Sequence, residues 1–246
     1  MRDRPLADEL WNRTVARLPI LSRLSTHELV KLRDLSTIFL VEKRFQALQD
    51  ASIDNDFRVA VAAQACLPIL EIGLDWYSGW KTILIIPDAY EITRTETDDS
   101  GVVHEYRDEL AGEVLHIGPV VLSVVDVLAS GSGDGYNVVI HEAAHKIDGK
   151  DDSFDGCPPL PEDIPIEEWR SVFTDAYERL RAGHRRKRRR SRPRIDPYAA
   201  FSPDEFFAVS VESFFECPAV LRSDFPGVYA LLSRFFRQDP YGRLTA

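Results

Sequence analysis

The chain has 246 residues, of which 44% are hydrophobic and 28% are charged, a balance typical of soluble globular proteins. No apolar stretch approaches the roughly 18 residues that a transmembrane helix needs, no signal peptide is evident, and three widely separated cysteines argue against a disulfide framework. We therefore expect a cytoplasmic protein that binds no membrane, and its net charge of −10 disfavours nucleic acid as a partner.

Three helices are predicted in the N-terminal part, at residues 7–18, 26–48 and 54–70, because apolar residues recur there at helical spacing. The second helix is expected to begin at Thr26 without a full capping box, and Pro68 disturbs the end of the third. None of them carries a cluster of reactive side chains, so packing in the core is their expected role.

The middle of the chain changes to patterns typical of strands. Short apolar runs predict strands at residues 80–87, 102–106 and 114–122. A glycine-rich loop then leads into a helix at 136–147, and an Asp-, Pro- and Gly-rich loop follows at 149–165.

Three more helices are predicted near the C-terminus, at residues 166–181, 203–215 and 225–237. Between the first two, residues 181–194 carry nine Lys or Arg and no acid. A solvated loop that repels itself is the simplest interpretation, and a contact for an acidic partner or nucleic acid is the alternative. We see no linker or repeat and predict one α+β domain over residues 1–246, mainly helical, around a small sheet.

The strongest chemical signal is the pattern His141-Glu142-Ala143-Ala144-His145. Two histidines four residues apart project from one face of a helix, so both rings can reach one zinc ion. Glu142 follows the first histidine and can take a proton from the water that the metal activates, then pass it to the leaving amine. A hydrogen-bonded structural pair of histidines is the alternative interpretation.

A catalytic zinc usually has three protein ligands, and no further histidine follows His145 at a suitable spacing. The third ligand is therefore expected from the helix at 203–215, which is mostly apolar and carries acids that need a partner or a metal. Glu205 and Glu212 are seven residues apart and share a face, and their spacing does not choose between them. Glu216 is expected to be solvated at the end of the helix.

Several separated motifs resemble one family. HEAAHKID, the upstream segments WKTILIIPDAY and GEVLHIGPVVLS, and the downstream segments DPYAAFSPDEFFAVSVESFFECP and FFRQDP are similar, in this order, to the Mlc titration factor A family of bacterial zinc peptidases. The resemblance covers roughly residues 25 to 240 and implies a zincin-like metallopeptidase fold of the gluzincin type. The arginine-rich segment at 181–194 and one extra residue between Glu205 and Glu212 depart from the family pattern.

The resemblance also implies roles for particular residues. It makes Glu205 the third zinc ligand, beside His141 and His145. Glu212 then resembles either an acid behind the ligands, a role that often orients ligand histidines, or a purely structural acid. It places His104 where a histidine can contact the metal, although an exposed strand residue is an equally good interpretation. It places Tyr198 near the metal as a possible donor to the oxyanion, with packing of the turn after Pro197 as the alternative.

Two functions follow from these observations. The first is hydrolysis of peptide substrates by a zinc-dependent enzyme with Glu142 as its general base, and the resemblance implies that its activity is aminopeptidase-like. The second, implied by the resemblance alone, is a regulator that binds and sequesters a transcriptional repressor such as Mlc and so links sugar uptake to transcription. Nucleic acid binding through the arginine-rich segment is a third hypothesis, weaker than these two.

Overall fold

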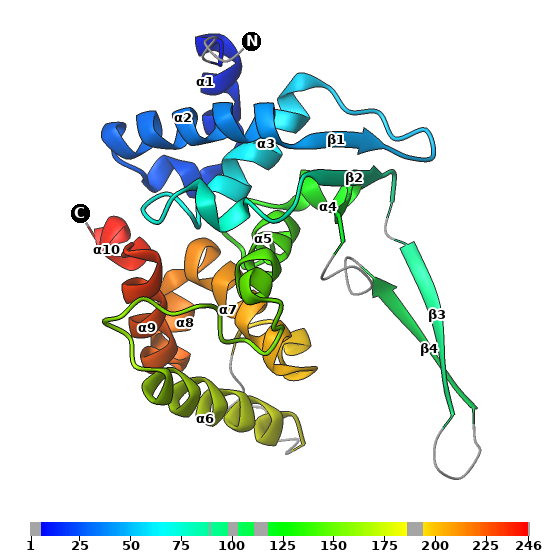
Figure 1. The fold of residues 1–246 in the computed structure, drawn as a ribbon, viewed down its shortest axis with the longest axis vertical. Helices are drawn as coiled ribbons and strands as arrows, with labels where there is room; N and C mark the ends of the chain where they lie inside the picture. Colours follow the sequence, from blue (N-terminus) through cyan, green and yellow to red (C-terminus); the bar gives the residue numbers. More distant parts are fainter. Residues whose placement is uncertain (1–5, 89, 98–102, 111–117, 186–193, 246) are drawn as a thin grey trace.

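The computed structural model describes residues 6–88, 90–97, 103–110, 118–185 and 194–245 (Figure 1). Helices make up most of this structure, and a small parallel sheet lies beside them, so the predicted mainly helical α+β class is confirmed. Within the described ranges, every helix is too short or too polar to cross a membrane. Cys66, Cys157 and Cys217 are free thiols.

The N-terminal part consists of α1 (Asp8–Arg17), the short 3-10 helix η1 (Pro19–Arg23), α2 (Thr26–Glu42) and α3 (Asn55–Cys66). Contrary to the expectation, α2 does begin with a capping box, in which Ser25 and Glu28 each bind the other's backbone N–H. The predicted end of α2 at residue 48 is wrong, because the backbone becomes extended at Lys43. The ammonium group of Lys43 donates to the carbonyls of Tyr77 and Trp80, which holds the chain in this new direction.

Three short parallel strands form the sheet in the order β1 (Arg44–Ala47), β2 (Thr82–Ile86) and β5 (Val120–Ser123). The strand predicted at 80–87 is β2, and the one predicted at 114–122 contributes β5, although residues 111–117 lie outside the described part. The short 3-10 helix η2 (Leu74–Tyr77) precedes β2.

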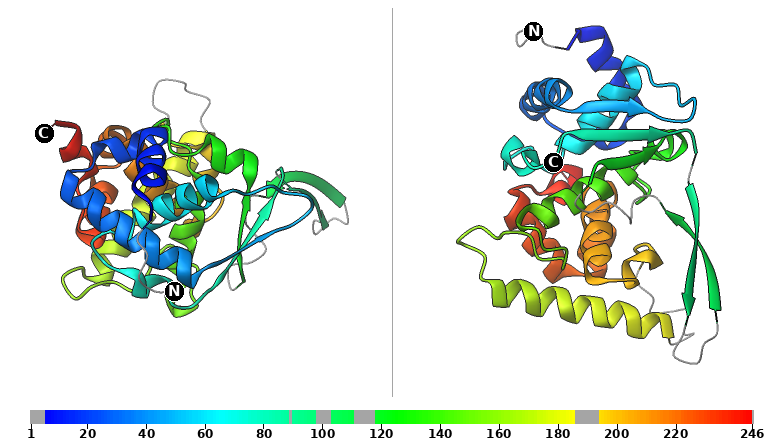
Figure 2. Two further views of the ribbon diagram at one scale, coloured as in Figure 1. Left: turned by 90° about the horizontal axis from the view of Figure 1, so that it is seen from above. Right: turned by 45° about the vertical axis from the view of Figure 1, so that its right-hand side comes forward.

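Two further strands, β3 (Tyr90–Thr97) and β4 (Val103–Leu110), pair with each other in an antiparallel ribbon. The ribbon projects to one side of the molecule (Figures 1 and 2). The strand predicted at 102–106 lies in β4, whereas β3 was not predicted, because its sequence YEITRTET has no apolar run.

The helix that carries both motif histidines, α5 (Val138–Asp148), lies near the centre of the molecule (Figure 1). It follows the short helix α4 (Val124–Ala129), and its exit leads through the 3-10 turn η3 (Gly149–Asp151). Nearly all of its residues are buried, and it packs most extensively against α7 (Pro203–Glu216). This pairing brings the two predicted sources of metal ligands together.

Four of the remaining elements pack against α7: α6 (Ile166–Arg185), η4 (Pro197–Ala200), α8 (Pro218–Asp224) and α9 (Pro226–Phe236). The last helix, α10 (Pro240–Thr245), packs against α8 and η1. On α6, Trp169 stacks on Phe173 with ring centroids 4.4 Å apart. The arginine-rich segment begins inside α6, which continues to Arg185, and residues 186–193 lie outside the described part.

One close approach fixes the start of α7 against the loop that follows α5. Gly156 has a φ of +77°, and a Cβ there would lie 2.6 Å from the carbonyl oxygen of Pro203. Its N–H donates to Asp148, and its carbonyl accepts from the indole of Trp169, both at 2.9 Å. Only glycine fits this conformation without strain.

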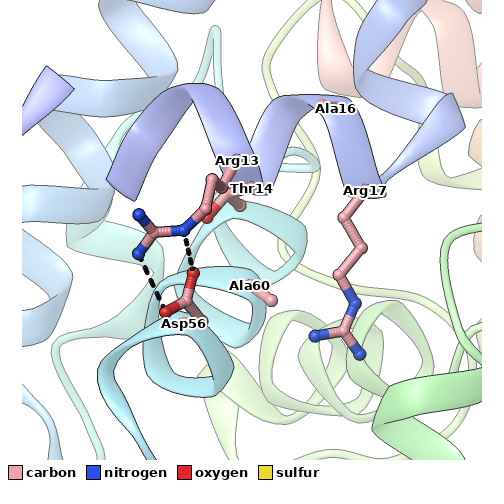
Figure 3. Close-up of a pocket in the computed structure, with 6 residues that line it drawn as sticks. All are labelled: Arg13, Thr14, Ala16, Arg17, Asp56 and Ala60. Atoms are coloured by element: carbon pink, nitrogen blue, oxygen red, sulfur yellow. Dashed lines mark hydrogen bonds and ion pairs between the residues drawn. The ribbon is translucent and has the colours of Figure 1, made fainter. Parts of the chain in front are cut away.

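A surface pocket lies between α1 and α3, where Arg13 makes two hydrogen bonds to the Asp56 carboxylate (Figure 3). Thr14, Ala16, Arg17 and Ala60 complete its lining. None of these residues belongs to the histidine motif or to α7, so this pocket is separate from the candidate site.

Candidate metal centre

Helix α5 begins at a buried N-cap and places its two histidines on one face. The side chain of Asn137 accepts from the N–H of Ile140, and the helix runs on through both histidines without a break. The Nε2 atoms of His141 and His145 lie 3.1 Å apart, and both rings are largely buried.

Helix α7 adds a carboxylate to this pair. One oxygen of Glu205 lies 3.0 Å from Nε2 of His141, and the other lies 3.5 Å from Nε2 of His145. One ligand atom from each of the three residues lies within 4.8 Å of the other two, and in the described part of the chain this is the one such group of His, Cys, Asp or Glu. We call this group of three side chains, which could together hold one ion, the metal cluster.

Glu212 occupies a different place, behind the ring of His141. Its Oε1 lies 2.6 Å from Nδ1 of His141, and its Oε2 accepts from the N–H of Asn137 at 2.8 Å. The spacing left Glu205 and Glu212 open as the third ligand. In the structure, Glu205 faces Nε2 of both histidines. Glu212 instead contacts Nδ1 of His141, on the far side of that ring.

The donor set fits a divalent cation such as zinc. If His141 donates its Nδ1–H to Glu212, the lone pair of Nε2 points toward His145 and Glu205, the arrangement that a metal ligand needs. Burial alone would lower the pKa of His141, but the carboxylates of Glu212 and Glu205 raise it well above its usual range. The cluster therefore attracts positive charge, which a proton or a metal ion can supply.

The pKa values of Glu205 and Glu142 shift in opposite directions. Burial would raise the pKa of Glu205, but hydrogen bonds to His141 and His145 outweigh it and lower the pKa well below its usual range. Burial raises the pKa of Glu142 to about 7, and its Oε1 is buried without a hydrogen-bond partner. A cation in the metal cluster would favour the charged form of Glu142.

Tyr198 lies beside the metal cluster, in η4. Its hydroxyl donates to Oε1 of Glu205 at 3.3 Å, and its ring centroid lies 6.2 Å from that of His141. The structure therefore brings Tyr198 close to the three predicted ligands. His104 lies on β4 with its backbone opposite Glu96, and its side chain is outside the described part of the structure.

The expectation that Glu216 is solvated is wrong. Its side chain is fully buried and accepts from Nδ2 of Asn137 at 2.7 Å and from the N–H of Gly133 at 2.6 Å. Asn137 also donates to Gln64 at 2.9 Å, so one amide joins α3, α5 and α7. The burial of Glu216 could have been predicted from its spacing, because it follows Glu212 by one helical turn and so lies on the same face of a mostly apolar helix.

A helix with the HExxH pattern, whose two histidines face one metal position, is typical of the zincin-like class of metallopeptidases. Residues 1–237 match the family described as glucose-regulated metallo-peptidase M90, and the chain belongs to this family. The resemblance found in the sequence is thereby confirmed.

Relatives named Mlc titration factor A are similar to this chain over most of its length. The relative from Salmonella arizonae is 35% identical over 244 residues, which cover 97% of this chain and 94% of the relative. The one from Klebsiella pneumoniae subsp. pneumoniae is 34% identical over 245 residues, 96% of this chain and 89% of the relative. The one from Edwardsiella ictaluri is 37% identical over 230 residues, 92% of this chain and 87% of the relative.

Proposed function

We propose that this metallopeptidase is a zinc enzyme of the gluzincin type, in which His141, His145 and Glu205 hold the ion. The convergence of these three side chains from α5 and α7 carries the proposal. Two neutral imidazoles and one carboxylate are a common ligand set for catalytic zinc and leave one position for water or substrate. Glu212 would orient His141 and fix its tautomer through the 2.6 Å contact with Nδ1.

The surrounding residues provide the remaining chemistry. A bound zinc ion would polarise the scissile carbonyl and promote ionisation of the attacking water. Glu142, adjacent to His141 and outside the ligand set, would accept the water proton on its carboxylate and deliver it to the leaving amine. The hydroxyl of Tyr198, which already lies 3.3 Å from Glu205, would donate to the oxygen that becomes negatively charged.

The substrate class is a peptide, and we propose aminopeptidase-like cleavage of short or unstructured chains in the cytoplasm. The test compares hydrolysis of amino-acyl chromogenic substrates and unstructured peptides by wild type and Glu142→Gln. We expect kcat to fall by roughly 10²- to 10⁴-fold while bound zinc is unchanged, because only the proton acceptor is lost. Glu9→Gln, an exposed glutamate on α1, is the matched control. Undiminished hydrolysis by Glu142→Gln would refute the assignment of the base.

A second candidate function is binding of a transcriptional repressor, which is favoured by the name that the relatives carry. In this case the chain would sequester an Mlc-like repressor, with or without peptide cleavage. The two functions separate in a pull-down with the Glu142→Gln protein. A repressor retained at wild-type level supports binding independent of catalysis, and no retention by either protein contradicts it.

A further inference from the structure

Phe201 differs from every other phenylalanine in the chain. All 13 phenylalanines lie in the described part of the structure, and Phe201 is the exposed one, with 56% of its surface accessible. Burial of a phenylalanine side chain stabilises a fold, and this position largely lacks that contribution. Phe206 and Phe207, which follow on α7, are buried and contribute to the core.

Phe201 stacks on a second exposed aromatic residue that touches the metal cluster. The rings of Tyr198 and Phe201 are nearly parallel, with an interplanar angle of 12° and centroids 5.9 Å apart. Tyr198 in turn lies 6.2 Å from the ring of His141 and donates to Glu205. A continuous row of rings therefore leads from the metal cluster to the surface.

The backbone beneath these two rings is held in place. The Asp196 carboxylate accepts from the N–H of Tyr198 at 2.8 Å. Ala199, which follows Tyr198 in the sequence, is fully buried. The hydroxyl of Tyr177 on α6 lies within hydrogen-bond distance of the carbonyls of Ala200 and Phe201. Rings presented on a fixed backbone lose little conformational freedom when they bind a ligand.

We propose that Tyr198 and Phe201 form an aromatic shelf that binds an aromatic or other bulky apolar side chain of the peptide substrate. Flat, exposed rings favour contact with another planar or apolar group, and this contact would orient the substrate beside the metal cluster. The shelf rests on the proposed peptidase function and adds a specificity to it. Phe201 lies outside the metal cluster and is linked to it through the ring of Tyr198, so its substitution can be separated from the chemistry.

The test measures peptide binding apart from cleavage. Zinc-loaded Glu142→Gln protein is titrated by calorimetry with tetra-alanine and with four tetrapeptides that carry a single phenylalanine at each position in turn. We expect phenylalanine at one position to tighten binding about 10-fold. In the Glu142→Gln, Phe201→Ala double variant this gain should disappear, and Phe201→Leu should retain part of it. Val41→Ala removes a similarly exposed apolar side chain on α2 and is expected to change none of the affinities.

The outcomes distinguish the shelf from the function on which it rests. A phenylalanine gain that survives Phe201→Ala, or no gain at any position, overturns the shelf even if the wild type cleaves peptides. If the gain in affinity depends on Phe201 but the wild type cleaves no peptide, the shelf is supported and the peptidase function is contradicted. A change of self-association on Phe201→Ala, with unchanged peptide affinities, would assign the exposed ring to a contact between copies and also overturn the proposal.

Discussion

Replacement of Asn137 by alanine should destabilise the protein far more than loss of an ordinary helix cap. The side chain of Asn137 is fully buried and accepts from the N–H of Ile140, as an N-cap does. It also donates to Gln64 and to Glu216, two buried groups on other helices. Asn137→Ala therefore removes a cap and leaves two buried acceptors with fewer partners.

The expected magnitude follows from these contacts. Loss of an N-cap costs about 1 kcal/mol, and each buried polar group that loses its partner costs about 1–3 kcal/mol. Burial already raises the pKa of Glu216, and the hydrogen bond from Asn137 opposes this shift. We expect Asn137→Ala to lower the free energy of unfolding by about 4 kcal/mol in total.

Urea unfolding followed by circular dichroism measures this loss. With a slope of about 3 kcal/mol per molar urea, the midpoint should fall by roughly 1.3 M. Asp54→Ala is the matched control, because Asp54 caps α3 by accepting from Phe57 at 2.8 Å, and its replacement should cost only about 1 kcal/mol. If both variants lose the same stability, the joining role of Asn137 is refuted.

Three other substitutions test separate parts of the structure. Gly156→Ala should lower the free energy of unfolding by about 1–3 kcal/mol, and should weaken zinc binding because the start of α7 is displaced. Gly79→Ala is the control, because an added Cβ there meets open space, and its urea unfolding should be nearly unchanged. Burial raises the pKa of Asp148 to about 8, so the folded state keeps a proton that the unfolded chain releases near pH 4, and stability should fall as pH rises between these values. Asp148→Asn should remove this fall and gain on the order of 5 kcal/mol relative to wild type at pH 8, and equal pH profiles would contradict it. Tyr198→Phe should lower kcat by roughly 10²-fold with unchanged zinc content, and an unchanged kcat would exclude an oxyanion role.

The histidine pair could be predicted from the sequence because its geometry is local. Residues four apart on any helix lie on one face, so His141 and His145 needed no knowledge of the fold. The choice between Glu205 and Glu212 depends on tertiary packing, because both lie on the same face of α7. The structure places Glu205 level with the histidines and Glu212 behind His141.

Other elements were missed because distant contacts determine them. Residues 44–47 continue an acceptable helical pattern, yet they form β1 because β2 offers a parallel partner and Lys43 binds carbonyls near Trp80. Glu216 appeared to be a solvated helix end, and the amide of Asn137 and the N–H of Gly133 make its burial possible. Whether the chain is a single domain stays a prediction.

The zinc content of purified protein tests the central claim most directly. Wild type should contain stoichiometric zinc by mass spectrometry, and His145→Ala and Glu205→Ala should each lose most of it, because three converging ligands are needed to hold the ion. Glu178→Ala, an exposed acid on α6, should retain wild-type zinc. Stoichiometric zinc in both ligand variants, or its absence from wild type supplied with zinc, would contradict the account.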